Sequence, residues 1–256
     1  MARIAVTGAA GSVGRQTLRG LADHDVTPLT HREHDDIDGK VVEVTEPDSI
    51  GPAIAGHDVV VHLAGNPSPE AEWDSVLHAN IDGTRNVYEA AREHDVERVV
   101  FASTNHVSQM HAIGDRTRPE TMGNDAPTIR PEDPTRPDSY YAISKVSGEA
   151  LGSYYADRYD LEVVDLRIGW LLTEDELRER QDEEDPEFAR YARAMWLSPR
   201  DCRDVMEQAV TADLSENPLT VNAISRNSER YLSVTETMRG LGYEPRDDSA
   251  EVVEDS

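Results

Sequence analysis

Short apolar runs rich in valine and isoleucine recur along this chain and alternate with stretches of helical periodicity. Runs that are apolar at nearly every position suit strands buried on both faces, as in a parallel sheet. The expected strands are Arg3–Val6, Val26–Thr30, Val41–Val44, Val59–Leu63, Val99–Ala102, Val163–Ile168 and Leu219–Ile224. Helices are expected between them, mainly over Gly11–Ala22, Trp73–His94 and Ser139–Tyr159. The alternation predicts an α/β fold with a doubly wound parallel sheet.

A glycine-rich loop follows the first of these strands. Its glycines allow a tight turn and let a pyrophosphate approach backbone amides at the N-terminus of a helix. The strand before the loop and the helix after it are the context that this motif requires. The loop predicts a dinucleotide site made by Gly8, Gly11, Ser12, Val13 and Gly14, with an ordinary glycine-rich turn as the alternative.

The end of the second strand indicates which dinucleotide is bound. An NAD site usually has an aspartate or glutamate there, which accepts hydrogen bonds from the ribose hydroxyls. This strand instead ends in His31-Arg32, and Arg32 can bind a 2′-phosphate. The sequence therefore favours NADP. NAD remains the alternative if Asp35 or Asp36 reaches back to the ribose.

A tyrosine and a lysine four positions apart, Tyr141 and Lys145, lie in the helix expected over Ser139–Tyr159. This spacing puts both side chains on one helical face, where an ammonium can lower the pKa of a phenol. Ser103-Thr104 ends the strand Val99–Ala102, at the sheet edge where the crevice of a doubly wound sheet opens. A hydroxyl there can orient a substrate hydroxyl while Tyr141 takes its proton. A capping or turn role is the alternative for such hydroxyls.

The chain is strongly acidic, with a net charge of −26 and an isoelectric point near 4.6. Its acidic residues are interleaved with apolar segments, which indicates a folded protein with a carboxylate-rich surface adapted to a very salty cytoplasm. Because there is no basic face, neither nucleic acid nor a membrane is expected as a partner. No signal-peptide pattern is found either, so we expect a cytoplasmic protein. A homo-oligomer is also expected.

Two segments interrupt the alternation of strands and helices. Asn105–Asp138 is long and rich in Pro, Gly, Arg and Thr, and a loop of that length is usually functional. Glu174–Asp185 is dense in charge and is expected to be a solvated helix or a mobile lid, with Glu183-Glu184-Asp185 as surface charge. The nine histidines and the single cysteine show no metal-ligand spacing, so no metal is expected.

Five motifs occur in one order along the chain: Thr7-Gly8-x-x-Gly11-x-x-Gly14, Val61-His62-Leu63-Ala64-Gly65, Asn80-Ile81-x-Gly83-Thr84, Ser103-Thr104-Asn105-His106 and Tyr141-x-x-x-Lys145. With them the chain resembles the extended short-chain dehydrogenase/reductase superfamily, also described as the NAD-dependent epimerase/dehydratase family, over roughly residues 3–245. Three more selective motifs are Asn105-His106, Leu166-Arg167-Ile168-Gly169 and Met195-Trp196-Leu197-Ser198. They resemble the branch that holds uronate dehydrogenases and the haloarchaeal glucose-6-phosphate dehydrogenase. Members of that branch oxidise the anomeric carbon of a cyclic sugar to a lactone.

The resemblance implies roles for individual residues. Tyr141 is the base, Lys145 its activator and a ligand of the nucleotide ribose, and Thr104 the hydroxyl partner, with Ser103 as the fallback. Together with the strand-end residues, the expected cofactor site comprises Gly8, Gly11, Ser12, Val13, Gly14, His31, Arg32, Leu63, Ala64, Asn80, Ser103, Tyr141 and Lys145. The expected substrate site comprises Ser68, Thr104, Asn105, His106, Tyr141, Arg190 and Arg193.

Three positions depart from the pattern of that branch. His31 replaces its usual acidic residue, and Trp170 stands where relatives carry a small or polar residue. Relatives also keep a substrate arginine five residues before the tryptophan of the Trp-Leu-Ser motif. That position is Tyr191 here, flanked by Arg190 and Arg193.

The expected organisation is a Rossmann dinucleotide-binding domain over residues 1–168 and a small C-terminal substrate-binding part over 169–256 that is not an independent domain. The short C-terminal part leaves little room for a second nucleotide. We therefore expect an NAD(P)-dependent sugar 1-dehydrogenase that oxidises an aldose, a uronate or a sugar phosphate. The alternatives are a sugar-nucleotide epimerase or dehydratase and a non-catalytic NADP-binding sensor.

Overall fold

Seven parallel strands form one sheet in the computed structural model, which describes residues 1–182 and 184–254. The strands are β1 (Arg3–Thr7), β2 (Asp25–Thr30), β3 (Lys40–Val41), β4 (Val59–His62), β5 (Arg98–Thr104), β6 (Glu162–Ile168) and β9 (Leu219–Ala223). Their spatial order is β3-β2-β1-β4-β5-β6-β9. The order reverses between β1 and β4, where the carboxyl ends of such strands open a crevice for ligands. The predicted doubly wound fold is confirmed.

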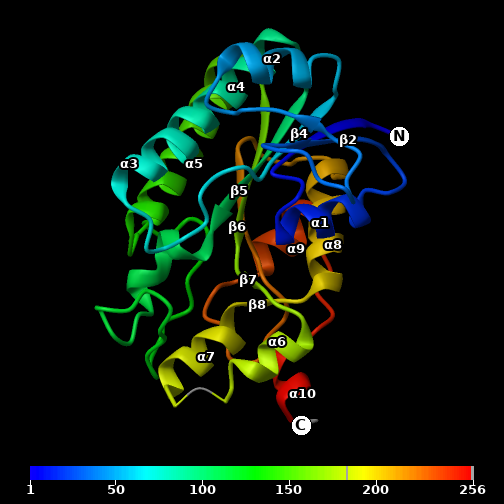
Figure 1. The fold of residues 1–256 in the computed structure, drawn as a ribbon. Helices are drawn as coiled ribbons and strands as arrows, with labels where there is room; N and C mark the ends of the chain where they lie inside the picture. The colour runs from blue at the N-terminus through cyan, green and yellow to red at the C-terminus, as the bar shows by residue number, and fades with distance from the viewer. Residues whose placement is uncertain (183, 255–256) are drawn as a thin grey trace.

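Helices cover both faces of this sheet (Figure 1). One face carries α1 (Ser12–Gly20), α8 (Pro199–Thr211) and α9 (Thr235–Leu241), and the other carries α2 (Pro47–Ile54), α4 (Gly83–Glu93) and α5 (Tyr140–Tyr159). The shorter elements are α3 (Trp73–Val76), the π-helical turn η1 (Leu77–Asp82) and the 3₁₀ helix η2 (Asn105–His111).

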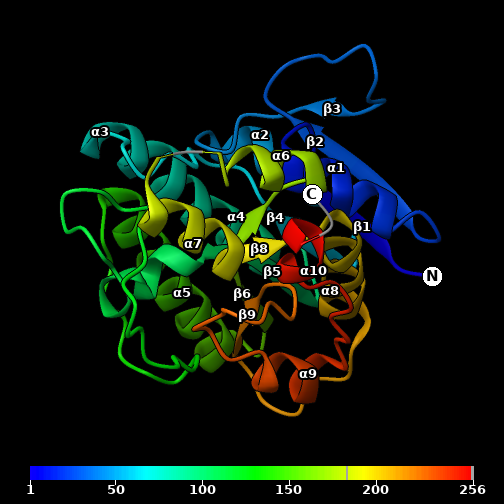
Figure 2. The same ribbon diagram turned by 90° about the horizontal axis from the view of Figure 1, so that it is seen from below.

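The remaining elements gather at the lower end of the sheet in Figure 1. They are a two-stranded sheet of β7 (Trp170–Leu171) and β8 (Trp196–Leu197), with helices α6 (Glu174–Glu179), α7 (Pro186–Met195) and α10 (Ser249–Glu254). Figure 2, viewed from that end, shows α7 and α10 on either side of β8. This group therefore stands close to the carboxyl ends of the central strands.

Alternate residues of the central strands fill two separate cores. Ile4 and Val6 of β1 pack in the core beneath α8, whereas Ala5 packs in the core beneath α2, α4 and α5. The same alternation holds in β4, where Val60 faces the second core. Because both faces are covered, every position of such a strand is buried, which explains the near-continuous apolar runs in the sequence.

Helix α2 is an element that the apolar pattern does not predict. Pro52 stands inside it, and an internal proline normally argues against a helix. Its Ile50 and Ile54, spaced one turn apart, are fully buried in the core shared with α4. Burial of this face against the sheet outweighs the unfavourable local sequence.

The third strand is shorter than the expected Val41–Val44. The carbonyl groups of Val44 and Thr45 accept hydrogen bonds from Asn86 Nδ2 at 3.1 and 3.0 Å. The Val42 amide still donates to the Thr30 carbonyl of β2 at 2.8 Å, but the Glu43 amide donates to Ser49 Oγ at 3.0 Å, so pairing with β2 does not extend to Val44.

The C-terminal part contributes to the main sheet. Strand β9 pairs with β6 at the edge of the sheet, and helix α8 packs on α1. Met206 of α8 and Val221 of β9 lie in the same hydrophobic core as Ile4 of β1. The boundary expected after residue 168 thus falls within one continuous core.

The acidic segment Glu174–Asp185 begins as helix α6. Reciprocal hydrogen bonds between Thr173 and Glu176 cap the N-terminus of this helix. Glu183, expected to be surface charge, lies outside the described residues. Among the described residues, no helix is long and apolar enough to cross a bilayer.

Candidate active site

The glycine loop between β1 and α1 forms one wall of a cavity of about 620 Å³. Gly8 has a φ of +67°, and a Cβ there would lie 2.7 Å from the Ala64 backbone nitrogen. A Cβ on Gly14 would lie 2.4 Å from the Gly8 carbonyl oxygen, so only glycine lets α1 pack this closely. The residues brought together here are Gly8, Gly11, Ser12, Val13, Gly14, Leu63 and Ala64. Backbone amides at a helix N-terminus and a wall without side chains fit the pyrophosphate of a dinucleotide.

A buried hydrogen-bond chain fixes the strand ends around this cavity. Thr7 Oγ1 accepts from the backbone amides of Leu63 and Ala64 at 3.1 and 3.2 Å. Its proton is therefore free to be donated to His62 Nδ1, 2.8 Å away. The His62 Nε2–H then donates to Thr84 Oγ1 of α4 at 3.1 Å. Burial lowers the pKa of His62 to about 3, which keeps the ring neutral in this chain.

The far end of the cavity carries basic side chains. His31, Arg32 and His34 line it, together with Glu43, whose Oε1 accepts hydrogen bonds from Thr45. Asp35 and Asp36 are the alternative acceptors for the ribose hydroxyls of NAD. Asp36 forms an ion pair with Arg15, and Asp35 is not part of the cavity wall. Arg32 therefore lines this end of the cavity together with His31 and His34.

Asn80 lies behind the cavity and holds its wall. Its Oδ1 accepts from the Asn66 backbone amide at 2.7 Å, and its Nδ2 donates to the Asn66 carbonyl at 3.0 Å. The same Nδ2 also donates to Ser144 Oγ of α5 at 2.9 Å. Asn80 is thus buried in η1 and shapes the Gly65–Asn66 turn that lines the cavity.

A second cavity, of about 280 Å³, adjoins the first at the carboxyl ends of β4, β5 and β6. Six residues line both cavities: Ser12, Val13, Leu63, Gly65, Asn66 and Pro67. The second cavity also receives Thr104, Tyr141 and Lys145. A ligand in the first cavity therefore reaches the reactive side chains of the second.

Helix α5 delivers Tyr141 and Lys145 to this second cavity. Ser139 caps the helix by accepting from the Ala142 amide at 3.1 Å, which places Tyr141 in the first turn and Lys145 one turn later. The Lys145 ammonium donates to the Ala102 carbonyl at 2.7 Å and lies 5.9 Å from the centre of the Tyr141 ring. Burial lowers the pKa of Lys145 to about 8.

The phenol of Tyr141 is held in its neutral form by the protein's own groups. Burial raises the pKa of Tyr141 to about 12, and a hydrogen bond with the Thr104 side chain acts in the opposite direction. The expected action of Lys145 on this phenol stays a prediction. A positive charge next to the phenol favours its ionised form.

The two hydroxyls at the end of β5 point to different partners. Thr104 lies beside Tyr141, as expected for the group that orients a substrate hydroxyl. Ser103 Oγ donates to Glu149 Oε1 at 2.6 Å, and the same carboxylate pairs with Arg167 at 2.8 Å. Ser103 is therefore hydrogen-bonded within a buried ion-pair network, whereas the Thr104 hydroxyl faces Tyr141.

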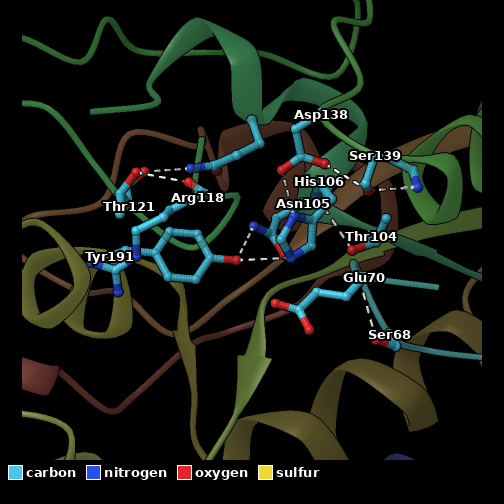
Figure 3. A network of polar contacts seen from close by, with 12 residues as sticks. Ser68, Glu70, Thr104, Asn105, His106, Arg118, Thr121, Asp138, Ser139 and Tyr191 are labelled. Atoms are coloured by element: carbon cyan, nitrogen blue, oxygen red, sulfur yellow. Dashed lines mark hydrogen bonds and ion pairs between the residues drawn. The ribbon is translucent and has the colours of Figure 1, made fainter. Parts of the chain in front are cut away.

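Asn105 and His106 belong to a buried chain of hydrogen bonds (Figure 3). His106 Nδ1 lies 2.7 Å from Asp138 Oδ2, so this nitrogen carries a proton and donates it. Asn105 Nδ2 donates to the Tyr191 hydroxyl at 2.8 Å, and that hydroxyl lies 3.1 Å from His106 Nε2. Asn105, Tyr191, His106 and Asp138 therefore form one continuous network.

The NAD dependent epimerase/dehydratase family matches residues 4–195, which is most of this chain. The chain belongs to this family. The resemblance inferred from its motifs is therefore confirmed.

This epimerase/dehydratase family member is 63% identical to the L-arabinose 1-dehydrogenase (NAD(P)(+)) of Haloferax volcanii, over 99% of this chain and 100% of that protein. It is 37% identical to the NAD-dependent glucose-6-phosphate dehydrogenase of the same organism, over 97% of this chain and 94% of that one. Among solved structures, a uronate dehydrogenase from Agrobacterium tumefaciens complexed with NAD has a TM-score of 0.80 and 27% identity, covering 100% of this chain and 88% of that one. The similarity extends over the whole described fold.

Three residues expected to bind substrate do not line the second cavity in this family member. Ser68 is exposed, and its hydroxyl accepts from the Glu70 amide at 3.2 Å. Arg190 donates to the Met122 carbonyl at 2.9 Å, and Arg193 pairs with Glu229 at 3.0 Å. The side chain that enters from α7 is instead Tyr191.

Four further residues belong to the site although the sequence analysis did not assign them to it. Glu120, Trp170 and Tyr191 line the second cavity, and Asp138 holds His106. Trp170 and Tyr191 stand at the departures from the family branch, which was a usable signal. Glu120 and Asp138 lie in the long Asn105–Asp138 segment, whose length indicates function but not which of its residues carry it.

Proposed function

We propose that this chain is an NAD(P)-dependent sugar 1-dehydrogenase whose substrate is a neutral aldose, with L-arabinose as the first candidate. Its relatives include an L-arabinose 1-dehydrogenase (NAD(P)(+)) and an NAD-dependent glucose-6-phosphate dehydrogenase. They confirm the predicted class, an NAD(P)-dependent oxidoreductase acting on a CH–OH group of a sugar. The choice of a neutral sugar is supported by the 63% identity to the first of them.

The observation that carries this choice is the charge on the wall of the second cavity. No arginine occurs among the described residues that line it. The one lysine there, Lys145, donates to the Ala102 carbonyl. Of the nearby arginines, Arg180 stacks on Trp170 with its Cζ 5.4 Å from the ring centre, and Arg190 and Arg193 bind Met122 and Glu229. Since carboxylates and phosphates are usually bound by arginine or a free ammonium, this wall suits an uncharged sugar.

The proposed reaction starts with the C1 hydroxyl placed between Thr104 and Tyr141. Thr104 orients the hydroxyl, Tyr141 accepts its proton, and the Lys145 ammonium stabilises the phenolate during the transfer. When bound, the oxidised nicotinamide would supply a positive charge and the acceptor for the hydride from C1. The sugar loses one hydride and one proton, a C1 carbonyl forms, and the product is the lactone.

The alternative functions receive less support from the site. A cavity of about 280 Å³ suits a single sugar ring better than the sugar nucleotide of an epimerase or dehydratase. The pairing of Tyr141 with Lys145 on one face of α5 supports catalysis, because a cofactor sensor needs no base. An epimerase would also return its cofactor to the oxidised form in each cycle, whereas a dehydrogenase accumulates the reduced form.

We further propose that NADP is preferred while NAD is also used. Arg32 and His31 on the wall of the first cavity support binding of a 2′-phosphate. The pairing of Asp36 with Arg15 supports the same preference, because this carboxylate is then engaged elsewhere.

A panel of sugars tests the proposed reaction. The purified protein in molar KCl is assayed with L-arabinose, D-galactose, D-glucuronate and D-glucose 6-phosphate, each with NAD+ and NADP+. We expect kcat/KM for L-arabinose to exceed that for the anionic sugars by at least about tenfold. NMR of the product identifies the lactone. A preference for an anionic sugar contradicts the neutral-substrate proposal, and no reduced cofactor with any sugar contradicts the dehydrogenase itself.

A further inference from the structure

Glu120 is a carboxylate on the wall of the second cavity that the proposed mechanism does not use. The next residue, Thr121, is fully buried and anchors this part of the segment (Figure 3). Its hydroxyl donates to the Arg118 carbonyl at 3.0 Å, and its carbonyl accepts from Gln109 Nε2 at 2.7 Å. Because the backbone at Thr121 is held in this way, Glu120 enters the cavity from a fixed position.

The Glu120 carboxylate is partly buried and has no hydrogen-bond or ion-pair partner within residues 1–182 and 184–254. Burial raises the pKa of Glu120, while the nearby charges of His106 and Arg180 act in the opposite direction. Such a carboxylate keeps all of its acceptor sites for a ligand. A ligand that donates hydrogen bonds offsets the cost of its burial.

Other polar side chains near Glu120 already form hydrogen bonds within the protein. Asn105, His106 and Tyr191 share the hydrogen bonds of their network. Asn66 donates to Ser75 at 2.7 Å through its side chain. Glu120 is therefore a carboxylate acceptor on this wall whose bonding capacity remains for the hydroxyls of a sugar.

We propose that Glu120 determines the class of sugar that this enzyme accepts. Its carboxylate accepts hydrogen bonds from ring hydroxyls of a neutral aldose and repels sugars that carry a carboxylate or a phosphate. The inference rests on the proposed function and assigns its selectivity to one residue. Two like charges about 5 Å apart at an effective dielectric constant of about 20 correspond to roughly a hundredfold or more in binding. Because the site is half-buried, salt screens this repulsion only in part.

Three variants separate the charge of Glu120 from its shape. Glu120→Gln removes the charge and keeps the size, whereas Glu120→Asp keeps the charge. Asp125→Asn is the matched control, since Asp125 is an exposed carboxylate of the same segment outside the cavity wall. The probes are L-arabinose as substrate, and D-galactose and D-galacturonate as substrates or as inhibitors of L-arabinose oxidation. The latter two share one ring configuration and differ at C6 by a neutral hydroxymethyl group against a carboxylate.

We expect Glu120→Gln to raise KM for L-arabinose about tenfold with a smaller change in kcat. It should also improve binding of D-galacturonate relative to D-galactose by at least about tenfold, while Glu120→Asp and Asp125→Asn keep the wild-type ratio. Thermal melts confirm that each variant is folded. If KM for L-arabinose stays within about twofold in Glu120→Gln, the acceptor role is wrong, and an unchanged galacturonate-to-galactose ratio rules out the exclusion role. A wild type that prefers D-galacturonate overturns the neutral-substrate proposal as well, which separates the two failures.

Discussion

Tyr191 is the residue that bears most directly on the proposed preference for a neutral sugar. Its hydroxyl is fully buried, accepts from Asn105 and lies 3.1 Å from His106 Nε2, so it completes the buried network. In the family branch that this chain resembles, the same position carries an arginine that contacts substrate. Replacing a guanidinium by a phenol removes the cation that would bind a sugar carboxylate, and no other arginine takes its place on the described wall.

Tyr141→Phe should abolish turnover because it removes the proton acceptor and leaves the shape of the site intact. General base catalysis contributes about 10²–10⁴-fold, so we expect kcat to fall by about a thousandfold. Binding of the dinucleotide, measured by fluorescence titration, should change little. Lys145→Met is the companion variant, and it should weaken both the rate and cofactor binding. A Tyr141→Phe enzyme with more than about a tenth of the wild-type rate would show that another group takes the proton.

Arg32→Ala should weaken NADP far more than NAD. A charge-assisted hydrogen bond to a phosphate contributes on the order of 1.5–3 kcal/mol, roughly ten- to a hundredfold in affinity. Catalytic efficiency with both cofactors measures the effect, and Arg19→Ala serves as control because Arg19 is exposed and lies off the cavity wall. His31→Asp should shift preference towards NAD by adding a ribose acceptor. Equal losses for both cofactors in Arg32→Ala would show that another group selects between them.

His62 joins three elements, since it binds Thr7 at the end of β1 and Thr84 in α4 from its own place at the end of β4. The ring is completely enclosed, and burial is the main reason why its pKa falls to about 3. The pKa of a histidine in an unfolded chain is about 6.5. Below this pH the unfolded state binds a proton on His62 that the folded state does not bind. Acidification therefore lowers the free energy of unfolding.

The expected acid sensitivity follows from that difference. Between pH 6.5 and the folded pKa of about 3, each unit of acidification removes up to about 1.4 kcal/mol from the free energy of unfolding. His62→Gln should be less stable than the wild type at pH 7, and the gap should narrow as the pH falls towards 5. Denaturant unfolding in molar salt at both pH values measures this, with the exposed His78→Gln as control. A gap that stays constant would show that His62 does not govern the acid response.

Local spacing and burial explain which elements and site residues can be predicted from the sequence. The strands, the glycine loop and the Tyr141–Lys145 pair depend on residues near one another in the chain. Arg190 and Arg193 show the limit, because neighbouring helical residues point in directions about 100° apart, and α7 turns Tyr191 towards the cavity instead. Glu120 reaches the site through tertiary contacts of an irregular segment, for which the sequence has no periodic signal.

At the scale of the whole molecule, acidic side chains dominate the surface. The net charge is −26, whereas buried arginines such as Arg98 and Arg167 are paired with glutamates. Repulsion among surface carboxylates opposes folding at low ionic strength and weakens when salt shortens the Debye length. The relatives from Haloferax volcanii agree with this reading of a salt-adapted protein. The homo-oligomer expected from the sequence stays a prediction.

Stability should therefore rise with salt. The Debye length falls from about 10 Å at 0.1 M to about 3 Å at 1 M, and relief of repulsion by a few kcal/mol would raise the melting temperature by roughly 10 °C. Thermal melts from dilute buffer to 3 M KCl measure the shift. A melting temperature independent of salt would contradict the proposed adaptation.

Because lysine is scarce in this chain, few side chains can react with amine-directed reagents. Of its two lysines, Lys145 is buried against the Ala102 carbonyl, whereas Lys40 is exposed on the edge strand β3. Cys202 is also fully buried. Amine-reactive reagents directed at side chains should consequently attach at Lys40, which is not among the residues that line the second cavity. The enzyme can thus be coupled to a solid support through one known lysine while its sugar-binding side stays open.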